Sequence, residues 1–344
     1  MVCAIPAIHS IRRAYPDAHL VLLTSPGKRG AAWAGDLVQA LDIVDEISLY
    51  HAENVAGWRN RLRWIRELRA RRFEVWIELP PVMAQFSYLI RNLLTARIAG
   101  ARWARGWRMD TIGIARQAQS EAIAFPDEVD RLLNLLGEIG IPGDDSIFPL
   151  ALPDRYQSKA QELLAGISDR QLIAIAPGAK RPTNRWPVER FTAVARQLAA
   201  QGFGIAVIGG AGERDLCAEI AVAAGDHAIN LAGQCSLAES CAVLRACVLL
   251  VCNDSGVQHM AAAVSTCCLS LFAARDFGLR WRPHGPNHAA IRKSVPCHTC
   301  LLELCPYDNR CLKLIEVDEV IQATYEMLKT TADEPGPAAR LEFA

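Results

Sequence analysis

The 344-residue chain is longer than one hydrophobic core usually serves, which predicts two domains of roughly 150 residues each. Its 37 basic and 37 acidic side chains cancel, so the chain lacks the positive charge of a general nucleic-acid binder, and no nucleic-acid partner is expected. Charged residues interrupt every apolar run before it reaches the roughly 18 residues that a membrane-spanning helix needs. The first residues also lack the basic region of a signal peptide, and we expect a cytoplasmic protein.

The first half of the chain predicts an irregular alternation of helices and strands. A helix is expected over Pro6–Tyr15, with only Met1–Ile5 ahead of it, and strands are expected at His19–Leu23, Val44–Leu49 and Val75–Leu79. A doubly wound domain normally begins with a buried strand. The early helix therefore indicates that a first strand is missing upstream.

A basic helix is expected between the second and third of these strands. The segment Trp58–Arg72 carries seven arginines and one acidic residue, Glu67, beside an apolar stripe that includes Leu62 and Leu68. One interpretation is a solvated basic face. The other is contact with anionic lipid headgroups, because amphipathic helices with basic faces lie in membrane interfaces.

The second half alternates more regularly, which is typical of repeated βα units and a parallel sheet. The expected strands are Leu172–Ala176, Gly204–Ile208, Ala228–Leu231, Val248–Cys252 and Cys268–Phe272, and the expected helices are Val188–Ala200, Glu213–Ala224 and Leu237–Ala246. Turn-forming residues at 142–155 mark a boundary, and Pro335-Gly336-Pro337 marks a disordered tail. The predicted domains are therefore 1–153 and 154–332, with a tail at 333–344.

A phosphate site is predicted where the strand Val248–Cys252 runs into Asn253-Asp254-Ser255-Gly256 and then into a helix. Open α/β sheets bind ligands at the carboxyl ends of their strands, and helix N-termini offer unpaired N–H groups to anions. Ser255 and His259 are four residues apart, so both can face one diphosphate. In the alternative interpretation, Asp254 and Ser255 only cap the helix.

Two further segments follow strands of the same half. The segment Pro177–Pro187 contains Gly178 and three cations, Lys180, Arg181 and Arg185, which could stabilise a departing diphosphate or form a solvated basic loop. The glycine-rich turn at 208–213 ends in Glu213. A carboxylate at this position commonly holds ribose hydroxyls, although it also favours the dipole of its own helix.

Four cysteines, Cys297, Cys300, Cys305 and Cys311, lie within fifteen residues, whereas the other eight occupy apolar patterns that fit a reducing compartment. The opening Cys-x-x-Cys has zinc-ligand spacing, but the later gaps are unlike those of zinc ribbons. A structural zinc or iron at these four cysteines and a purely structural thiol or disulfide role both remain open.

Together these segments resemble glycosyltransferase family 9, the ADP-heptose:lipopolysaccharide heptosyltransferases. The resemblance runs from Ile5–Pro16 through the Pro-Gly-Ala and Arg-Trp-Pro stretch, the Gly-Gly turn and Asn-Asp-Ser-Gly to the cysteine loop. It implies an α/β GT-B fold, in which two Rossmann-like domains face a central cleft, with the acceptor in the first domain and the nucleotide sugar in the second. It also implies an inverting transfer of heptose from ADP-heptose that needs no metal for catalysis.

By position, the resemblance assigns donor phosphate and sugar contacts to the Asn-Asp-Ser-Gly segment and its histidine, and the ribose to the carboxylate of the glycine-rich turn. The complete expected donor site is Gly178, Lys180, Arg181, Arg185, Glu213, Asp254, Ser255, Gly256 and His259.

The chain departs from the family pattern at two positions. Asn184 stands where the family usually has a lysine, so Lys180, Arg181 or Arg185 must supply the charge. The family's general base is an aspartate that would immediately precede Met1. A positioned carboxylate contributes on the order of 100- to 10,000-fold to the activation of a hydroxyl. We therefore expect that the chain starts late and that no residue within it is the base.

The resulting hypothesis is a cytoplasmic, peripheral glycosyltransferase that transfers heptose to a lipopolysaccharide core or related glycan and contacts the inner leaflet of a membrane. Two alternatives remain: a GT-B nucleotide-sugar-binding protein without transferase activity, and a nucleotide-sugar epimerase. A nicotinamide dehydrogenase fits poorly, because no Gly-x-Gly-x-x-Gly follows an early strand.

Overall fold

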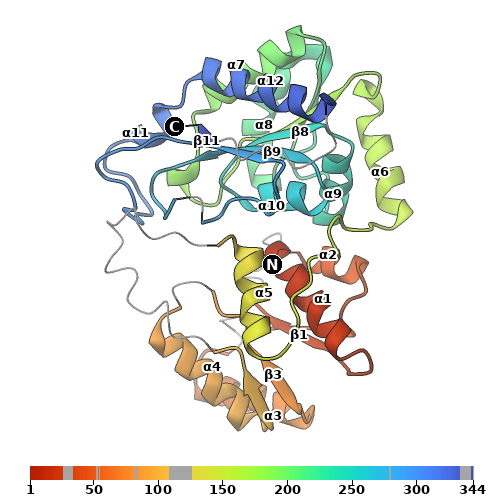
Figure 1. Ribbon diagram of the computed structural model, residues 1–344, viewed down its shortest axis with the longest axis vertical. Helices are drawn as coiled ribbons and strands as arrows, with labels where there is room; N and C mark the ends of the chain where they lie inside the picture. The colour runs from red at the N-terminus through yellow and green to blue at the C-terminus, as the bar shows by residue number, and fades with distance from the viewer. Residues whose placement is uncertain are drawn as a thin grey trace.

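The computed structural model describes residues 1–25, 34–51, 53, 55–81, 84–107, 126–278, 280–333 and 342–343. Figure 1 shows two α/β parts, the first coloured red to yellow and the second green to blue. The segment 139–153 links the last helix of the first part, α5 (Glu128–Glu138), to the first helix of the second, α6 (Asp154–Leu164). Among these residues, no helix combines the length and apolar character needed to cross a membrane.

A parallel sheet of seven strands, in the order β11-β10-β9-β8-β5-β6-β7, forms the centre of the second part. Its strands are β5 (Leu172–Ala176), β6 (Gly204–Val207), β7 (Ala228–Asn230), β8 (Leu249–Asn253), β9 (Cys267–Phe272), β10 (His288–Arg292) and β11 (Glu342–Phe343). Strands β5, β8 and β9 are buried along their whole length, since helices cover both faces of the sheet. This is why they appear in the sequence as continuous apolar runs.

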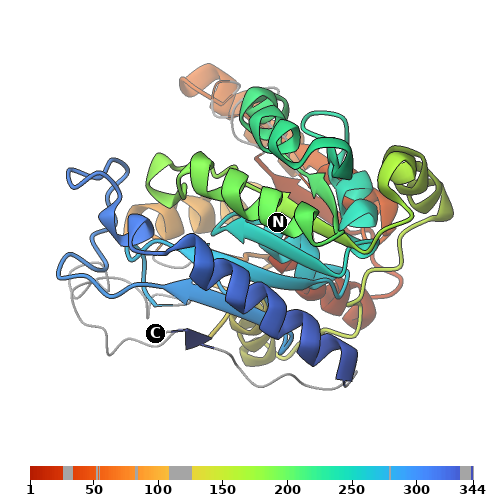
Figure 2. The same cartoon turned by 90° about the horizontal axis from the view of Figure 1, so that it is seen from above.

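Successive residues of β5 point into two different cores. Ile173 and Ile175 pack with one group of helices, α7 (Val188–Ala200), α8 (Arg214–Ala224) and α12 (Val317–Asp333). Ala174 packs on the other side with α6, α9 (Leu237–Arg245) and α10 (Gly256–Ala263). Figure 2 shows α7 and α12 side by side on the first of these faces. The short helix α11 (Arg310–Lys313) precedes α12.

The first part contains two separate two-stranded parallel sheets, β1–β2 and β3–β4. Its strands are β1 (Val21–Thr24), β2 (Glu46–Leu49), β3 (Val75–Ile77) and β4 (Trp103–Arg105); its helices before α5 are η1 (Val2–Ala4), α1 (Ile5–Ala14), α2 (Gly35–Ala40), α3 (Trp58–Ala70) and α4 (Phe86–Ile98). In contrast to the second part, no described strand here is buried along its whole length.

The expected strands of the second half agree with β5 to β9 to within one residue at each end, and the expected helix Val188–Ala200 coincides with α7. Helix α9 begins with a capping box, in which the Glu239 amide donates to Ser236 Oγ at 3.2 Å and the Ser236 amide donates to Glu239 Oε2 at 2.7 Å. In the tail, β11 pairs with β10, and the Pro335-Gly336-Pro337 segment lies outside the described residues.

The two parts share one hydrophobic core. Ile5 and Leu37 of the first part are fully buried in the same cluster as α9 and α10 of the second. The carboxylate of Asp36 accepts a hydrogen bond from the Ala238 amide at the start of α9, at 3.2 Å. The first part is therefore packed directly onto the helices that follow β7 and β8.

A histidine in the loop after β9 forms a second connection between the parts. His284 Nδ1 lies 3.1 Å from Asp127 Oδ2, and its Nε2 lies 3.1 Å from Asp145 Oδ2. Asp127 also caps α5, where it accepts hydrogen bonds from two backbone amides. Hydrogen bonding to Asp127 raises the pKa of His284 to about 9, so the ring is charged at pH 7.

Candidate functional site

The strand order reverses direction between β5 and β8. After β5 the chain passes through α7 to β6, whereas after β8 it passes through α10 to β9 on the opposite side of the sheet. The loops that follow these two neighbouring strands therefore diverge and leave a crevice, the usual ligand site of an open α/β sheet.

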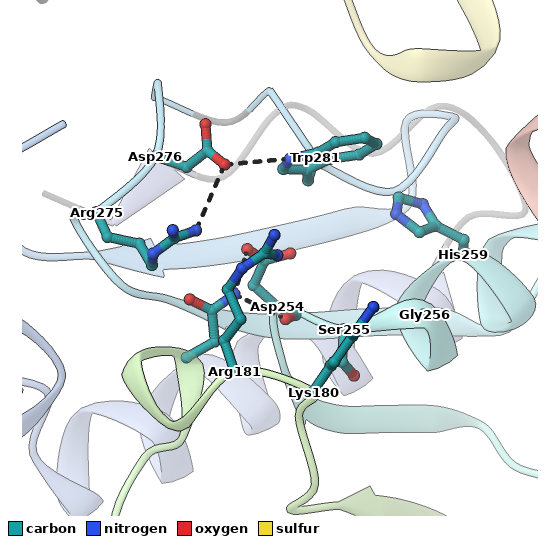
Figure 3. A pocket seen from close by; sticks show the side chains of 10 residues that line it. Lys180, Arg181, Asp254, Ser255, Gly256, His259, Arg275, Asp276 and Trp281 are labelled. Atoms are coloured by element: carbon teal, nitrogen blue, oxygen red, sulfur yellow. Dashed lines mark hydrogen bonds and ion pairs between the residues drawn. The ribbon is translucent and has the colours of Figure 1, made fainter. Parts of the chain in front are cut away.

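A pocket of about 200 Å³ lies at this point. Figure 3 shows side chains entering it from the loop after β5, from the start of α10 and from the loop after β9. The lining residues are Lys180, Arg181, Asn184, Asp254, Ser255, Gly256, His259, Arg275, Asp276 and Trp281.

Asn253, the last residue of β8, holds two of these loops together. Its side chain is fully buried, donates to the Pro177 carbonyl at 2.7 Å and accepts from the Trp186 amide at 3.0 Å. Both ends of the segment after β5 are thus tied to the end of β8. This arrangement fixes the position of the cations that the segment carries.

The start of α10 is left free of side-chain caps. Ser255 occupies the N-cap position, yet its hydroxyl makes no capping hydrogen bond. The carboxylate of Asp254 instead accepts from Gln258 Nε2 at 2.9 Å and from Asn184 Nδ2 at 3.1 Å. The interpretation that these two residues merely cap the helix is therefore wrong. The first N–H groups of a helix generally lack partners in its own α-helical pattern, and Ser255 and Gly256 at the start of α10 line the pocket.

Burial shifts the pKa values of the two titratable side chains of this segment, Asp254 and His259. It raises the pKa of Asp254 to about 6, with a further contribution from the nearby carboxylate of Asp276. It lowers the pKa of His259 to about 4, so this ring is neutral at pH 7. The ring of His259 lies edge-on to Trp281, with centroids 6.4 Å apart.

The three cations expected after β5 have different positions. Lys180 and Arg181 line the pocket, but Arg185 does not; its Nε donates to the Ala179 carbonyl at 2.8 Å. Asn184, which replaces the family's lysine, is buried and bonded to Asp254. The positive charge on this wall therefore comes from Lys180 and Arg181.

Glu213 and Gly178 lie next to each other but outside the pocket lining. A Cβ atom on Gly178 would be 2.0 Å from Glu213 Oε1, so any other residue at position 178 would require the Glu213 carboxylate to move. Glu213 Oε2 accepts from the Gly210 amide at 2.8 Å. The carboxylate thus closes its own turn and touches the base of the loop after β5.

Three lining residues, Arg275, Asp276 and Trp281, were not anticipated from the sequence. They follow β9, and the position of Arg275 and Asp276 just after a predicted buried strand was the available signal. Asp276 connects the group, since its carboxylate accepts from Trp281 Nε1 at 3.3 Å and lies 3.8 Å from Arg275 Nη1. Figure 3 shows these contacts on the side of the pocket opposite Lys180.

The loop of four cysteines supports this wall. Arg275 donates to the carbonyl groups of Leu301 and Leu302, at 3.0 and 2.9 Å, and Arg181 pairs with Glu303 at 2.9 Å. The bond to Arg181 lowers the pKa of Glu303. The loop therefore positions two cations of the pocket.

The sulfur atoms of the four cysteines are not gathered around one point in this arrangement. All four are partly buried free thiols, and no three of their sulfur atoms lie within 4.8 Å of one another. Four thiolates around one zinc at about 2.3 Å must be closer than this. Within the described residues, the grouping that meets this distance is Asp127, Asp130 and His284, whose atoms are already bonded to each other.

Comparison with known proteins agrees with this geometry. A family model described as glycosyltransferase family 9 (heptosyltransferase) matches residues 61–310. Lipopolysaccharide heptosyltransferase 2 of Salmonella typhimurium is 27% identical over 281 residues, which cover 76% of each chain. Lipopolysaccharide heptosyltransferase 3 of Escherichia coli is 26% identical over 360 aligned residues, which cover 99% of this chain and 98% of the relative.

Solved structures share the fold. A family 9 glycosyltransferase from Veillonella parvula superposes with a TM-score of 0.74 at 18% identity, covering 96% of this chain and 94% of its own. The ADP-heptose lipopolysaccharide heptosyltransferase II of Escherichia coli superposes with a TM-score of 0.66 at 21% identity, covering 96% of both chains. Because the family model spans most of the sequence and both parts superpose, the chain belongs to glycosyltransferase family 9 and is a glycosyltransferase with the GT-B fold.

Proposed function

We propose that this enzyme transfers heptose from ADP-heptose to a lipopolysaccharide core or a related glycan, with inversion at the sugar carbon. The observation that carries the proposal is the pocket between β5 and β8, where the uncapped start of α10 faces Lys180 and Arg181. The relatives named above, which act on lipopolysaccharide, support the choice of sugar and acceptor.

The donor diphosphate is proposed to bind at the start of α10. The free N–H groups, the Ser255 hydroxyl and the open space beside Gly256 suit a phosphate there. Lys180, Arg181 and Arg275 face the same space. As the glycosidic bond to the diphosphate breaks, negative charge grows on the leaving group, and fixed cations stabilise that state more than the ground state.

The uncharged parts of the donor, which are its sugar and its ribose, are assigned to His259, Asp254 and Glu213. A neutral His259 beside Trp281 can exchange hydrogen bonds with sugar hydroxyls without adding charge. Asp254 faces the same region. Glu213 and Gly178 adjoin the pocket from the next strand, which suits a ribose whose phosphates lie at α10. Arg185 is left out of this proposed site, because its guanidinium is bonded to the Ala179 carbonyl and its side chain does not line the pocket.

The proton acceptor in this proposal is the aspartate that the family resemblance expects immediately before Met1. Helix η1, at this end of the chain, contacts α10, whose first residues line the donor pocket. Such a carboxylate would take the proton from the acceptor hydroxyl as it attacks the sugar carbon. No step of the proposed transfer uses a cofactor.

The two parts are proposed to divide the substrates, with the acceptor held by residues 1–153 and the donor by 154–332. Helix α6 begins at Asp154 and packs on α9 of the second part, which supports this boundary. An acceptor of the lipopolysaccharide class is carried by lipid, so we further propose that the enzyme works at the cytoplasmic face of a membrane.

The decisive experiment incubates ADP-heptose with a heptose-deficient lipopolysaccharide core and measures ADP release and the mass of the product. It compares forms that carry Asp or Asn before Met1, and we expect transfer only with Asp. A changed sugar configuration without acceptor would instead identify an epimerase. Tight ADP-heptose binding with no turnover in either form would identify a binding protein.

A pair of variants tests the charge assignment within the same assay. Replacement of Lys180 and Arg181 by Ala is expected to lower the transfer rate by about 100-fold or more, as for other groups that stabilise developing charge. Arg185→Ala removes one positive charge just outside the pocket and should change the rate little. Equal losses in both variants would contradict the proposed phosphate site.

A further inference from the structure

The charge of this neutral chain is concentrated in one stretch of the first part. Residues 58–105 contain eleven arginines and three glutamates, a net charge of +8 in a molecule whose total is zero. Every arginine of the segment 59–72 is exposed. Within the described part of the chain, Arg71 is the one arginine of this segment that is seen to pair with a carboxylate. Its Nη1 lies 2.6 Å from Glu46 Oε1.

The next helix, α4, exposes an apolar ridge beside this charge. Phe86, Ile90, Leu94 and Ile98 follow one another at intervals of four residues and are 54%, 42%, 54% and 50% exposed. Since side chains four apart lie above one another on a helix, they form a continuous row. The opposite face of α4 is already buried through Leu89 and Ala96. The row therefore does not serve the core of this molecule, and exposed apolar patches of this kind mark contact surfaces.

The charge and the ridge belong to one surface. Helices α3 and α4 are in contact, and a Cβ atom on Gly100, just past the end of α4, would lie 3.9 Å from the side chain of Arg69. On the other flank, α4 contacts β4, whose Trp103 is 51% exposed between Arg102 and Arg105. Figure 1 shows α3 and α4 at the end of the first part that lies away from the second part.

We propose that this α3–α4 surface, formed by the ridge of α4, Trp103 and the arginines of α3, docks on the interface of an anionic lipid bilayer. The ridge would lie among the upper acyl chains, the arginines would contact lipid phosphates, and Trp103 would occupy the boundary, where indole rings are favoured. A protein partner would have to supply both an apolar groove and many carboxylates, whereas an anionic membrane offers both chemistries in one plane.

This inference deepens the proposed function and rests on it for its purpose, because a lipid-carried acceptor is confined to a membrane. A docked enzyme meets such an acceptor by diffusion in two dimensions. Docking also turns the second part, which holds the donor pocket, toward the aqueous phase, where nucleotide sugars are dissolved.

The test is co-flotation of the full chain with vesicles of phosphatidylcholine, alone or with phosphatidylglycerol added. We expect flotation with the anionic vesicles at low salt and its loss at high salt. Replacement of Ile90 and Leu94 by Asn should weaken binding to the vesicles at least about tenfold, because burying even one apolar side chain of this size strengthens binding by about that factor. Val222→Asn, an 81% exposed position in the second part, is the control and should float like the wild type.

The charge is tested separately. Replacement of Arg63 and Arg66 by Gln should weaken binding to anionic vesicles by roughly fivefold per cation, whereas the same changes at the exposed Arg196 and Arg214 of the second part should have little effect. Circular dichroism confirms that each variant is folded. Wild-type protein that stays unbound on anionic vesicles, or that forms dimers abolished by the Ile90 and Leu94 changes, would overturn the inference.

The same variants separate docking from catalysis. On a deacylated, water-soluble acceptor, the α4 variant should retain the wild-type transfer rate, and it should lose rate only when the acceptor is embedded in vesicles. Flotation without transfer to either acceptor would leave docking intact and refute the proposed function. Equal rates of both proteins on the embedded acceptor would refute docking instead.

Discussion

Asn253 shows how much of the site depends on one buried amide. It is fully buried and connects the Pro177 carbonyl to the Trp186 amide, so it joins β8 to both ends of the segment that bears Lys180 and Arg181. Most of the side chains that enter the pocket are exposed or half-buried by comparison, although Asn184 and Arg275 are also buried. The precision of the pocket is thus set by a residue that does not line it.

Asn253→Ala is therefore expected to destabilise the fold by about 2–4 kcal/mol, because a buried carbonyl and a buried amide each lose their partner. Urea denaturation measures this change. Asn60→Ala removes an exposed side chain that donates to the Ala56 carbonyl and should change the stability by only a few tenths of a kcal/mol. Equal effects at the two positions would show that Asn253 does not have the proposed tying role.

Gly256 allows a separate test of the donor site. A Cβ atom there would meet no atom within 4 Å, so Gly256→Ala should leave the unfolding temperature unchanged or slightly higher. The same methyl group would occupy space assigned to the diphosphate, and we expect ADP-heptose affinity to fall by about tenfold or more, roughly 1.4 kcal/mol or more. Titration calorimetry measures the affinity, and Gly212→Ala, which is equally unhindered, is the control.

At the scale of elements, the second part could be predicted closely and the first only in outline. Strands β5, β8 and β9 are buried on both faces, so their apolar runs have clear ends. In the first part β3 and β4 have three residues each and are partly exposed, which gives almost no periodic signal. Strand β4 and helix α4 were not anticipated.

The candidate site shows the same division. Asp254, Ser255, Gly256 and His259 lie within six consecutive residues and could be recognised as one motif. Arg275, Asp276 and Trp281 come from a different loop, and only the sheet order places that loop beside α10. Residues that converge through tertiary structure leave no spacing pattern in the sequence. The position of Arg185 outside the pocket lining could not be foreseen for a similar reason, because a local charge pattern does not reveal side-chain direction.

The effect of the loop at 297–311 on ADP binding can be measured without disturbing the fold. Glu303 is exposed and competes with any bound anion for Arg181. Glu303→Gln should therefore strengthen ADP binding severalfold at low salt, with the gain disappearing at high salt. Glu316→Gln, which removes an exposed carboxylate paired with Arg190, should leave ADP affinity unchanged. Weaker binding in Glu303→Gln would mean that positioning of Arg181 outweighs competition for it.

At the scale of the whole molecule, His284 connects the two parts through the loop that also lines the donor pocket. The loop that bears it also carries Asp276 and Trp281 of the pocket, while its partners Asp127, Asp130 and Asp145 belong to the first part and the linker. Opening between the parts would separate this cation from three carboxylates. The contact therefore favours the arrangement in which the parts are closed on each other.

The pH dependence of this contact has a defined sign. The pKa of His284 is raised to about 9, so the stabilisation is complete below the unfolded value of about 6.5 and is lost as the pH rises through 9. His284→Gln should lower the free energy of unfolding by on the order of 2 kcal/mol at pH 6 and by much less at pH 10. Urea denaturation across this range tests it, with the exposed His19→Gln as the control. A difference that is constant with pH would exclude the charged contact.

The raised pKa of Asp254 has a consequence for how the donor arrives. With a pKa of about 6, this carboxylate is mostly ionised at pH 7 but is close to its titration range, and a diphosphate placed beside it would raise the pKa further. Donor binding should then draw a proton from solution, and the affinity should decline as the pH rises from 6 to 8. Calorimetric titration in buffers of different ionisation enthalpy would reveal this uptake as a buffer-dependent heat, absent in Asp254→Asn. The enzyme would in effect bind its donor together with a proton.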